Sequence, residues 1–184
     1  MGRIDTRLTK DGRAMHIRLA LPGDAVRLIE ITDTVAHEQY YIGRSSFNPS
    51  PEDYARDIAT CDLENRALYV VEVDGGIIGA LEINRSTNPK RNHTMSIGMF
   101  MLSGYRGVGI GTALMQTAIA WGKTRKLEKA FLSVYHSNEA ALALYRKFGF
   151  VECGRYTKQY RVGDFYIDEI FMEYFFTESG RTLN

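Results

Sequence analysis

Three glycines in one short segment constrain the fold of this 184-residue chain more than any other feature. Gly107, Gly109 and Gly111 lie between a run that alternates like a strand and a run with helical periodicity. A glycine-rich turn from a strand into a helix presents several backbone N–H groups, and the positive end of the helix dipole, to an anion. A Cβ here would hold a phosphate away from the backbone. The segment therefore predicts a phosphate site, and more specifically a pyrophosphate site.

Two other glycine-rich phosphate motifs do not fit this segment. A P-loop needs Lys and then Ser or Thr after its last glycine, whereas Gly111 is followed by Thr112 and Ala113. A Rossmann motif has the spacing Gly-x-Gly-x-x-Gly and opens a parallel βαβ unit. Here the spacing is Gly-x-Gly-x-Gly, after an antiparallel meander. A tight strand-to-helix turn without a ligand remains the structural alternative.

The remaining sequence predicts short strands and helices around one mixed sheet. An Asp-Gly turn signal at residues 10–13 indicates a hairpin within residues 6–20. Further strands are expected over residues 67–73, 77–84, 93–102, 129–135 and twice within 150–176, with helices starting near residues 24, 51, 111 and 138. This order predicts an α/β fold with helices on both faces of the sheet. We expect a single domain over residues 1–184, with its core over about 14–176 and a polar end beyond.

The composition excludes several classes of partner. With 23 basic and 22 acidic residues the net charge is +1, so there is no bulk reason to expect nucleic acid or an acidic membrane. Cys61 and Cys153 form neither a disulfide framework nor a zinc motif, and no metal is expected. The N-terminus has no apolar signal segment, and no apolar run is long enough to cross a bilayer. We therefore expect a cytoplasmic protein.

Two blocks of the sequence resemble the motifs of the GNAT superfamily of N-acetyltransferases. Arg106-x-x-Gly109-x-Gly111 matches its Arg/Gln-x-x-Gly-x-Gly/Ala motif. Residues 138–150 read Asn-Glu-Ala-Ala-Leu-Ala-Leu-Tyr-Arg-Lys-Phe-Gly-Phe, similar to the family's Asn-x-x-Ala-x-x-Leu-Tyr-x-x-x-Gly-Phe. The resemblance covers about residues 14–175. Within the superfamily, the chain looks most like small bacterial amine or amino-acid acetyltransferases. It implies the GNAT fold, a mostly antiparallel central sheet with one splayed parallel strand pair.

The resemblance also implies how acetyl-CoA binds as the acyl donor. Met99, Phe100 and Met101 should offer backbone groups to the pantetheine arm. Asn138 should form a hydrogen bond with the donor near the splayed strands, and Tyr145 should lie beside the sulfur. The pyrophosphate contacts are expected from the loop and the first turn of the helix: Arg106, Gly107, Val108, Gly109, Ile110, Gly111 and Thr112.

Acetyl transfer to an amine requires three proton-handling or charge-stabilising groups. An alkylamine is mostly protonated at pH 7, so a base or a water chain must remove its proton. A backbone N–H near Met101 is the candidate donor to the oxyanion. Tyr145 is the candidate that protonates the departing thiolate, and direct attack in a ternary complex needs no covalent intermediate. Tyr145 also shares a helical stripe with Leu144 and Phe148, so core packing is the alternative.

The resemblance does not identify the general base. Many relatives place a glutamate at a position matching Ser96 or Ser133, and both are serines here. Glu82, on the neighbouring strand, is our first candidate. Because Leu81 and Ile83 flank it, Glu82 could instead point outwards as a solvated charge. The alternatives are Glu72, Asp168, Glu169, His93 or water alone.

These observations predict an N-acetyltransferase that acts on a primary amine of a small molecule. A protein N-terminal or lysine acetyltransferase is the second prediction, and a non-catalytic acetyl-CoA-binding regulatory module is the third. Aromatic residues in the loop 40–47 (Tyr40, Tyr41 and Phe47) are expected near the acceptor. Homodimers are common in the superfamily, so the resemblance allows a homodimer. Neither the acceptor nor the range of acyl groups follows from the sequence.

Overall fold

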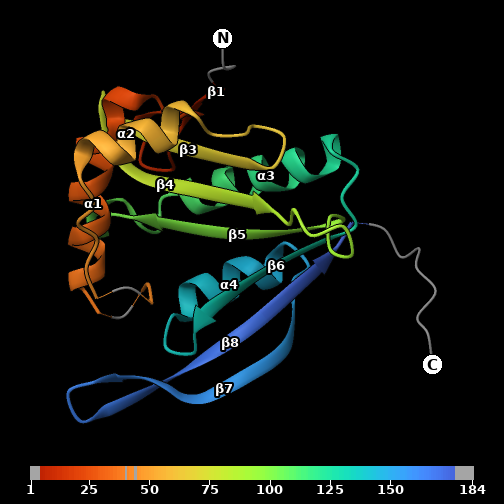
Figure 1. Cartoon of the computed structure of the whole chain (residues 1–184). Helices are drawn as coiled ribbons and strands as arrows, with labels where there is room; N and C mark the ends of the chain where they lie inside the picture. Colours follow the sequence, from red (N-terminus) through yellow and green to blue (C-terminus); the bar gives the residue numbers. More distant parts are fainter. Residues whose placement is uncertain (1–4, 40, 44, 177–184) are drawn as a thin grey trace.

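The computed structural model describes residues 5–39, 41–43 and 45–176, which form one eight-stranded sheet with helices on both faces (Figure 1). The strands are β1 (Asp5–Leu8), β2 (Ala14–Leu19), β3 (Arg66–Val73), β4 (Gly76–Arg85), β5 (Thr94–Met101), β6 (Lys129–Tyr135), β7 (Val151–Val162) and β8 (Phe165–Phe175). The longer helices are α1 (Ala25–His37), α2 (Pro51–Ala59), α3 (Ile110–Thr124) and α4 (Glu139–Lys147). The strand order β1-β2-β3-β4-β5-β6-β8-β7 confirms the predicted mixed sheet.

Local signals set most of the helix ends. Ser50 caps α2 by accepting a hydrogen bond from the Asp53 amide, and Asn138 caps α4 through the Ala141 amide. Gly149 follows α4 with φ +89°, a left-handed conformation that favours glycine. Asp24 does not act in this way. It stands at the N-cap of α1, but its carboxylate accepts hydrogen bonds from Arg18 and the Leu21 amide and caps no amide of α1.

Two hydrophobic clusters hold the layers together. On one face, α1 and α2 bury Leu28, Ile31 and Ile58 against β3 and β4. On the opposite face, the cluster that includes Leu114 and Trp121 of α3 packs against strands β2 to β6 and β8, with Leu142 of α4 beside it. We call the first the α1 face and the second the α3 face. This burial is the main stabilising contribution that fixes the helices on the sheet.

The only parallel pairing between described strands, β5 with β6, is short. The two strands pair at Thr94↔Lys129, Met95↔Ala130 and Ser96↔Phe131, and not beyond. Figure 1 shows them meeting at one end and diverging toward the other. All the other strand pairs are antiparallel. The sheet is therefore splayed along the second halves of β5 and β6, as the resemblance predicted.

Candidate active site

The splay leaves backbone groups of β5 without a strand partner. Leu102 donates its amide to the carbonyl of Ile78, at 2.9 Å, and the β4–β5 register continues from there. In an antiparallel pair each residue directs both backbone groups to one side, and the sides alternate. Phe100 therefore directs its backbone groups to β4, whereas Met99 and Met101 direct theirs into the splay. An extended ligand with amide groups can add to such an edge as a strand does.

The glycine loop lies just beyond this edge, at the N-terminus of α3. Gly107 and Gly109 have φ values of +80° and +97°, which the turn requires and which favour glycine. Gly109 is the N-cap residue, so no side chain caps α3. The amides of Ile110, Gly111 and Thr112 in the first turn are thus available to an anion. The chain fits a pyrophosphate at this position.

Gly111 has a second reason to be glycine. A Cβ at this position would lie 2.9 Å from Cδ2 of Leu144, on α4. The absence of a side chain therefore lets α3 and α4 approach each other. This contact brings the helix that carries Asn138 and Tyr145 next to the glycine loop.

Arg106 does not direct its guanidinium at the phosphate position. Its Nε and Nη2 donate to the carbonyl of Met101 at 3.2 and 2.8 Å, and its Nη1 pairs with Glu38 at 2.7 Å. Its guanidinium also stacks on the ring of Tyr41, 3.9 Å from the centroid. The side chain thus joins the end of β5 to the segment after α1. The backbone amides of the loop that follows Arg106, and not its side chain, are therefore the candidate phosphate ligands.

Tyr145 and Asn138 come from α4, beside the splay. Tyr145 is 7% exposed, and burial raises the pKa of its phenol to about 12. The hydroxyl therefore keeps its proton at neutral pH. No hydrogen bond joins it to any described residue. Asn138 uses its Oδ1 on the Ala141 amide at 3.2 Å, which leaves its Nδ2 to donate to a ligand.

Glu82 lies on the α1 face, one strand away from the splay. It is paired across the sheet with Gly98 of β5, and its side chain is 39% exposed. Its carboxylate lies 3.3 Å from Nη2 of Arg66, which also pairs with Asp57 of α2 at 2.7 Å. Glu82 and Ser96 lie on the same face of the sheet. Glu82 as the general base stays a prediction. The positive charge of Arg66 compensates the charge of its carboxylate.

The other candidates for the base lie at different distances from the splay. His93 precedes β5 at the end where β5 and β6 still pair, and Glu72 is bound to Arg18 at 2.6 Å on β2. Asp168 accepts hydrogen bonds from Arg155 and from the Lys158 amide. Glu169 pairs across the sheet with Tyr135, the last residue of β6. Of these alternatives, Asp168 and Glu169 stand at the open end of the splay, because the Asp168 backbone pairs with His136 and Glu169 pairs with Tyr135.

Contacts between the segment after α1 and the C-terminal hairpin border the α1 face of the splay. The hydroxyl of Tyr135 donates to the carbonyl of Ile42 at 2.9 Å. Tyr135 and Tyr160 of β7 pack with ring centroids 4.8 Å apart, and a Cβ on Gly43 would lie 2.8 Å from the Tyr160 hydroxyl. Tyr41 contacts Arg106, and Phe47 packs on Tyr54 of α2. Tyr40 lies outside the described residues. No local pattern predicts the Tyr135 and Tyr160 contacts, because they join distant segments.

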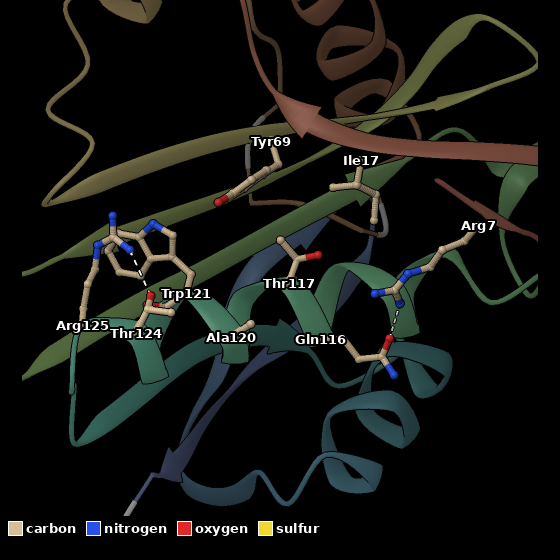
Figure 2. Close-up of a pocket in the computed structure, with 9 residues that line it drawn as sticks. All are labelled: Arg7, Ile17, Tyr69, Gln116, Thr117, Ala120, Trp121, Thr124 and Arg125. Atoms are coloured by element: carbon tan, nitrogen blue, oxygen red, sulfur yellow. Dashed lines mark hydrogen bonds between the residues drawn. The ribbon is translucent and has the colours of Figure 1, made fainter. Parts of the chain in front are cut away.

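A separate groove of about 320 Å³ lies on the α3 face, between α3 and strands β1 to β3. Figure 2 shows Tyr69 and Ile17 on one side and Thr117 and Trp121 on the other, with Arg125 stacked on Trp121. Arg7 closes one end through a hydrogen bond to Gln116. The groove contains neither the glycine loop nor the open edge of β5, so the splay stays the candidate active site.

Taken together, the open β5 edge, the uncapped glycine loop and a buried tyrosine define a site for an extended molecule that carries a pyrophosphate. The family model described as "Acetyltransferase (GNAT) family" matches residues 32–150. An N-alpha-acetyltransferase of Sulfurisphaera tokodaii is 31% identical over 154 residues, which cover 78% of this chain and 84% of that protein. The L-amino acid N-acetyltransferase AaaT of Escherichia coli is 27% identical over 128 residues, covering 67% and 77%.

Solved structures agree on the fold. An acetyltransferase of the GNAT family from Streptococcus pneumoniae superposes with a TM-score of 0.80 at 23% identity, covering 88% of this chain and 98% of that one. A GNAT superfamily phosphinothricin acetyltransferase from Sinorhizobium meliloti, in complex with AcCoA, gives 0.78 at 18% identity and covers 88% of each. The chain belongs to the GNAT family. It is an acetyl-CoA-dependent N-acetyltransferase, as the two motifs predicted. Within the described residues, no helix is long and apolar enough to span a membrane.

Proposed function

We propose that the acceptor is a primary amine of a small molecule, which attacks the thioester directly in a ternary complex. The observation that carries this proposal is the contact of the segment after α1 with the end of β6 and with β7. Ile42 and Gly43 meet Tyr135 and Tyr160 across the α1 face. Such a contact restricts the acceptor side, which suits a compact amine better than an extended peptide.

The residues of the site have distinct roles in this proposal. The amides of the glycine loop hold the pyrophosphate, and the backbone groups of Met99 align the pantetheine arm, because the Met101 carbonyl is bonded to Arg106. The Met101 amide, or one close to it, stabilises the oxyanion. Tyr145 donates its proton to the thiolate as the C–S bond breaks. Glu82, acting through water, takes the proton from the amine as the C–N bond forms.

A protein N-terminus is the second candidate acceptor. The similarity to an N-alpha-acetyltransferase over 78% of this chain favours it. The two candidates differ in length: a peptide acceptor must extend past the contact between Ile42 and Tyr135, whereas a small amine does not need to.

Release of CoA thiol from acetyl-CoA tests the proposal. Purified protein is offered amino acids, polyamines, aminoglycosides and short peptides at equal concentration. We expect release well above acetyl-CoA hydrolysis with one class of small amine. Turnover with peptides alone would replace this proposal by the N-terminal acetyltransferase. Tight acetyl-CoA binding without turnover on any acceptor would instead favour a regulatory module.

A further inference from the structure

The turn between β1 and β2 packs directly on the glycine loop, although about a hundred residues separate them in the sequence. The amide of Lys10 donates to the carbonyl of Val108 at 2.8 Å. The guanidinium of Arg13 lies over the ring of Tyr105, 4.6 Å from its centroid. The backbone hydrogen bond fixes the start of the Lys10 side chain beside the N-terminus of α3.

The Lys10 side chain extends along Gly109. Its Cγ, Cδ and Cε lie 3.5, 4.0 and 3.9 Å from the point where a Cβ of Gly109 would be. Its ammonium group therefore lies close to the first turn of α3. The residue is exposed, and its ammonium forms no hydrogen bond or ion pair with any described residue.

The neighbouring charges do not neutralise Lys10. The Asp11 carboxylate accepts hydrogen bonds from Arg13 and Thr9, which lower its pKa to about 2. Arg13 is in turn committed to Asp11 and Tyr105. Arg106, the arginine of the glycine motif, is committed to Met101 and Glu38. Lys10 is thus the cation beside the loop that has no partner among the described residues.

We propose that Lys10 is a donor-binding residue whose ammonium pairs with a phosphate of acetyl-CoA. The inference rests on the donor site assigned above and adds to it a cation from outside both GNAT motifs. The loop amides supply hydrogen bonds to a pyrophosphate, but Arg106, the cation of the motif, is engaged with Met101 and Glu38. A lysine behaves as a flexible point charge and can reach a phosphate at the mouth of this loop. Two phosphate groups of the donor offer this chemistry, the pyrophosphate and the ribose 3′-phosphate.

Calorimetric titration of the full chain tests the proposal. Wild type, Lys10→Met and Lys10→Arg are titrated with acetyl-CoA and with 3′-dephospho-acetyl-CoA, at low and at high salt. Methionine keeps the aliphatic packing along Gly109, and the backbone bond to Val108 remains. Lys10→Met should raise the Kd for acetyl-CoA about 10-fold at low salt, and by less at high salt. Lys10→Arg should retain most of the affinity.

Lys90→Met is the matched control, because Lys90 is exposed in the turn before β5 and should leave the Kd unchanged. If Lys10→Met weakens both donors equally, the ammonium pairs with the pyrophosphate. If it weakens only acetyl-CoA, the partner is the 3′-phosphate. An unchanged Kd in Lys10→Met, with normal binding by wild type, would overturn the role of Lys10 alone. No binding by wild type would overturn the donor site itself.

Discussion

Tyr145 combines a buried position with a hydroxyl that no described residue uses. Its neighbours explain the burial, since Leu142 of α4 and Phe150, which follows the helix, belong to the same cluster. A buried phenol normally finds a hydrogen-bond partner. Burial also raises its pKa to about 12, so the group remains a proton donor across the range in which an amine is acetylated. A residue that served packing alone would not require this hydroxyl.

Tyr145→Phe should therefore lower kcat about 100-fold, which is the usual size of a general-acid contribution. The Kd for acetyl-CoA should change little, because the hydroxyl acts mainly in the transition state. Steady-state kinetics and calorimetry on the same preparation measure the two effects. Tyr69→Phe is the control, since Tyr69 is partly buried in the groove on the α3 face, away from the splay. Wild-type kcat in Tyr145→Phe would reduce Tyr145 to a packing residue.

Strands β4 and β5 leave no room for a side chain at Gly79. A Cβ on Gly79 would lie 2.5 Å from the carbonyl oxygen of Phe100 and 2.8 Å from Cβ of Met101. Because these are backbone and near-backbone atoms, the strand itself would have to move. The segment that would shift is the end of β5, whose Met101 amide faces the splay.

Gly79→Ala should consequently destabilise the fold by about 1–3 kcal/mol, the usual cost of overpacking. It should also weaken acetyl-CoA binding, because the end of β5 is displaced. Urea unfolding measures the first effect and calorimetry the second. Gly76→Ala in the same strand is the control. Its Cβ would meet the Val73 carbonyl at an ordinary 3.8 Å, so its stability should stay within about 0.5 kcal/mol of wild type. If Gly79→Ala has the free energy of unfolding of wild type, β5 accommodates the added methyl group and the prediction is wrong.

Elements whose signals are local were predictable from the sequence. Helices were expected to start near residues 51 and 138, where Ser50 and Asn138 cap them, and Gly149 follows the end of α4. Side-chain partners from distant segments were not predictable. Arg18, which binds Asp24 nearby, also pairs with Glu72 of β3, because β2 and β3 are neighbours in the sheet. Likewise, nothing in the Asp-Gly turn signal at Lys10 indicates that the turn packs on residues 105–109.

The splay itself was predicted only through the family resemblance. Periodicity assigns β5 and β6 as strands, but it does not say where their pairing ends. The pairing stops at Ser96 and Phe131, where neither sequence carries a break such as proline. The direction of each backbone group, which separates Phe100 from Met99 and Met101, then follows from the register with β4. Residue identities alone do not contain that register.

Across the whole molecule, carboxylates and phenols set the pH range of stability at opposite ends. For Asp24, burial alone would raise the pKa, but hydrogen bonds from Arg18 and the Leu21 amide lower it overall. For Asp168, the Lys158 amide and Arg155 lower the pKa. A lowered carboxyl pKa contributes stability above the unfolded value of 3.8, and that stability is lost as the pH falls through the folded pKa.

The phenols act in the opposite direction. Burial raises the pKa of Tyr145 to about 12, against an ordinary phenol value of 10.0. The neutral phenol is therefore favoured in the folded state. Its contribution is fully present below pH 10 and is lost as the pH rises through the folded pKa of about 12. From pH 10 to pH 11, this loss lowers the free energy of unfolding by about 1 kcal/mol.

Tyr145→Phe should remove this loss, because phenylalanine cannot ionise in either state. The free energy of unfolding of wild type, measured by urea at a series of pH values, should fall more steeply above pH 10 than that of Tyr145→Phe, by about 1 kcal/mol near pH 11. Tyr166→Phe is the control, because Tyr166 is 52% exposed and should leave the alkaline slope unchanged. Parallel slopes for wild type and Tyr145→Phe would mean that the phenol ionises as easily in the folded chain as in the unfolded one. The hydroxyl would then titrate near the ordinary phenol pKa of 10.0, and burial would not protect its proton.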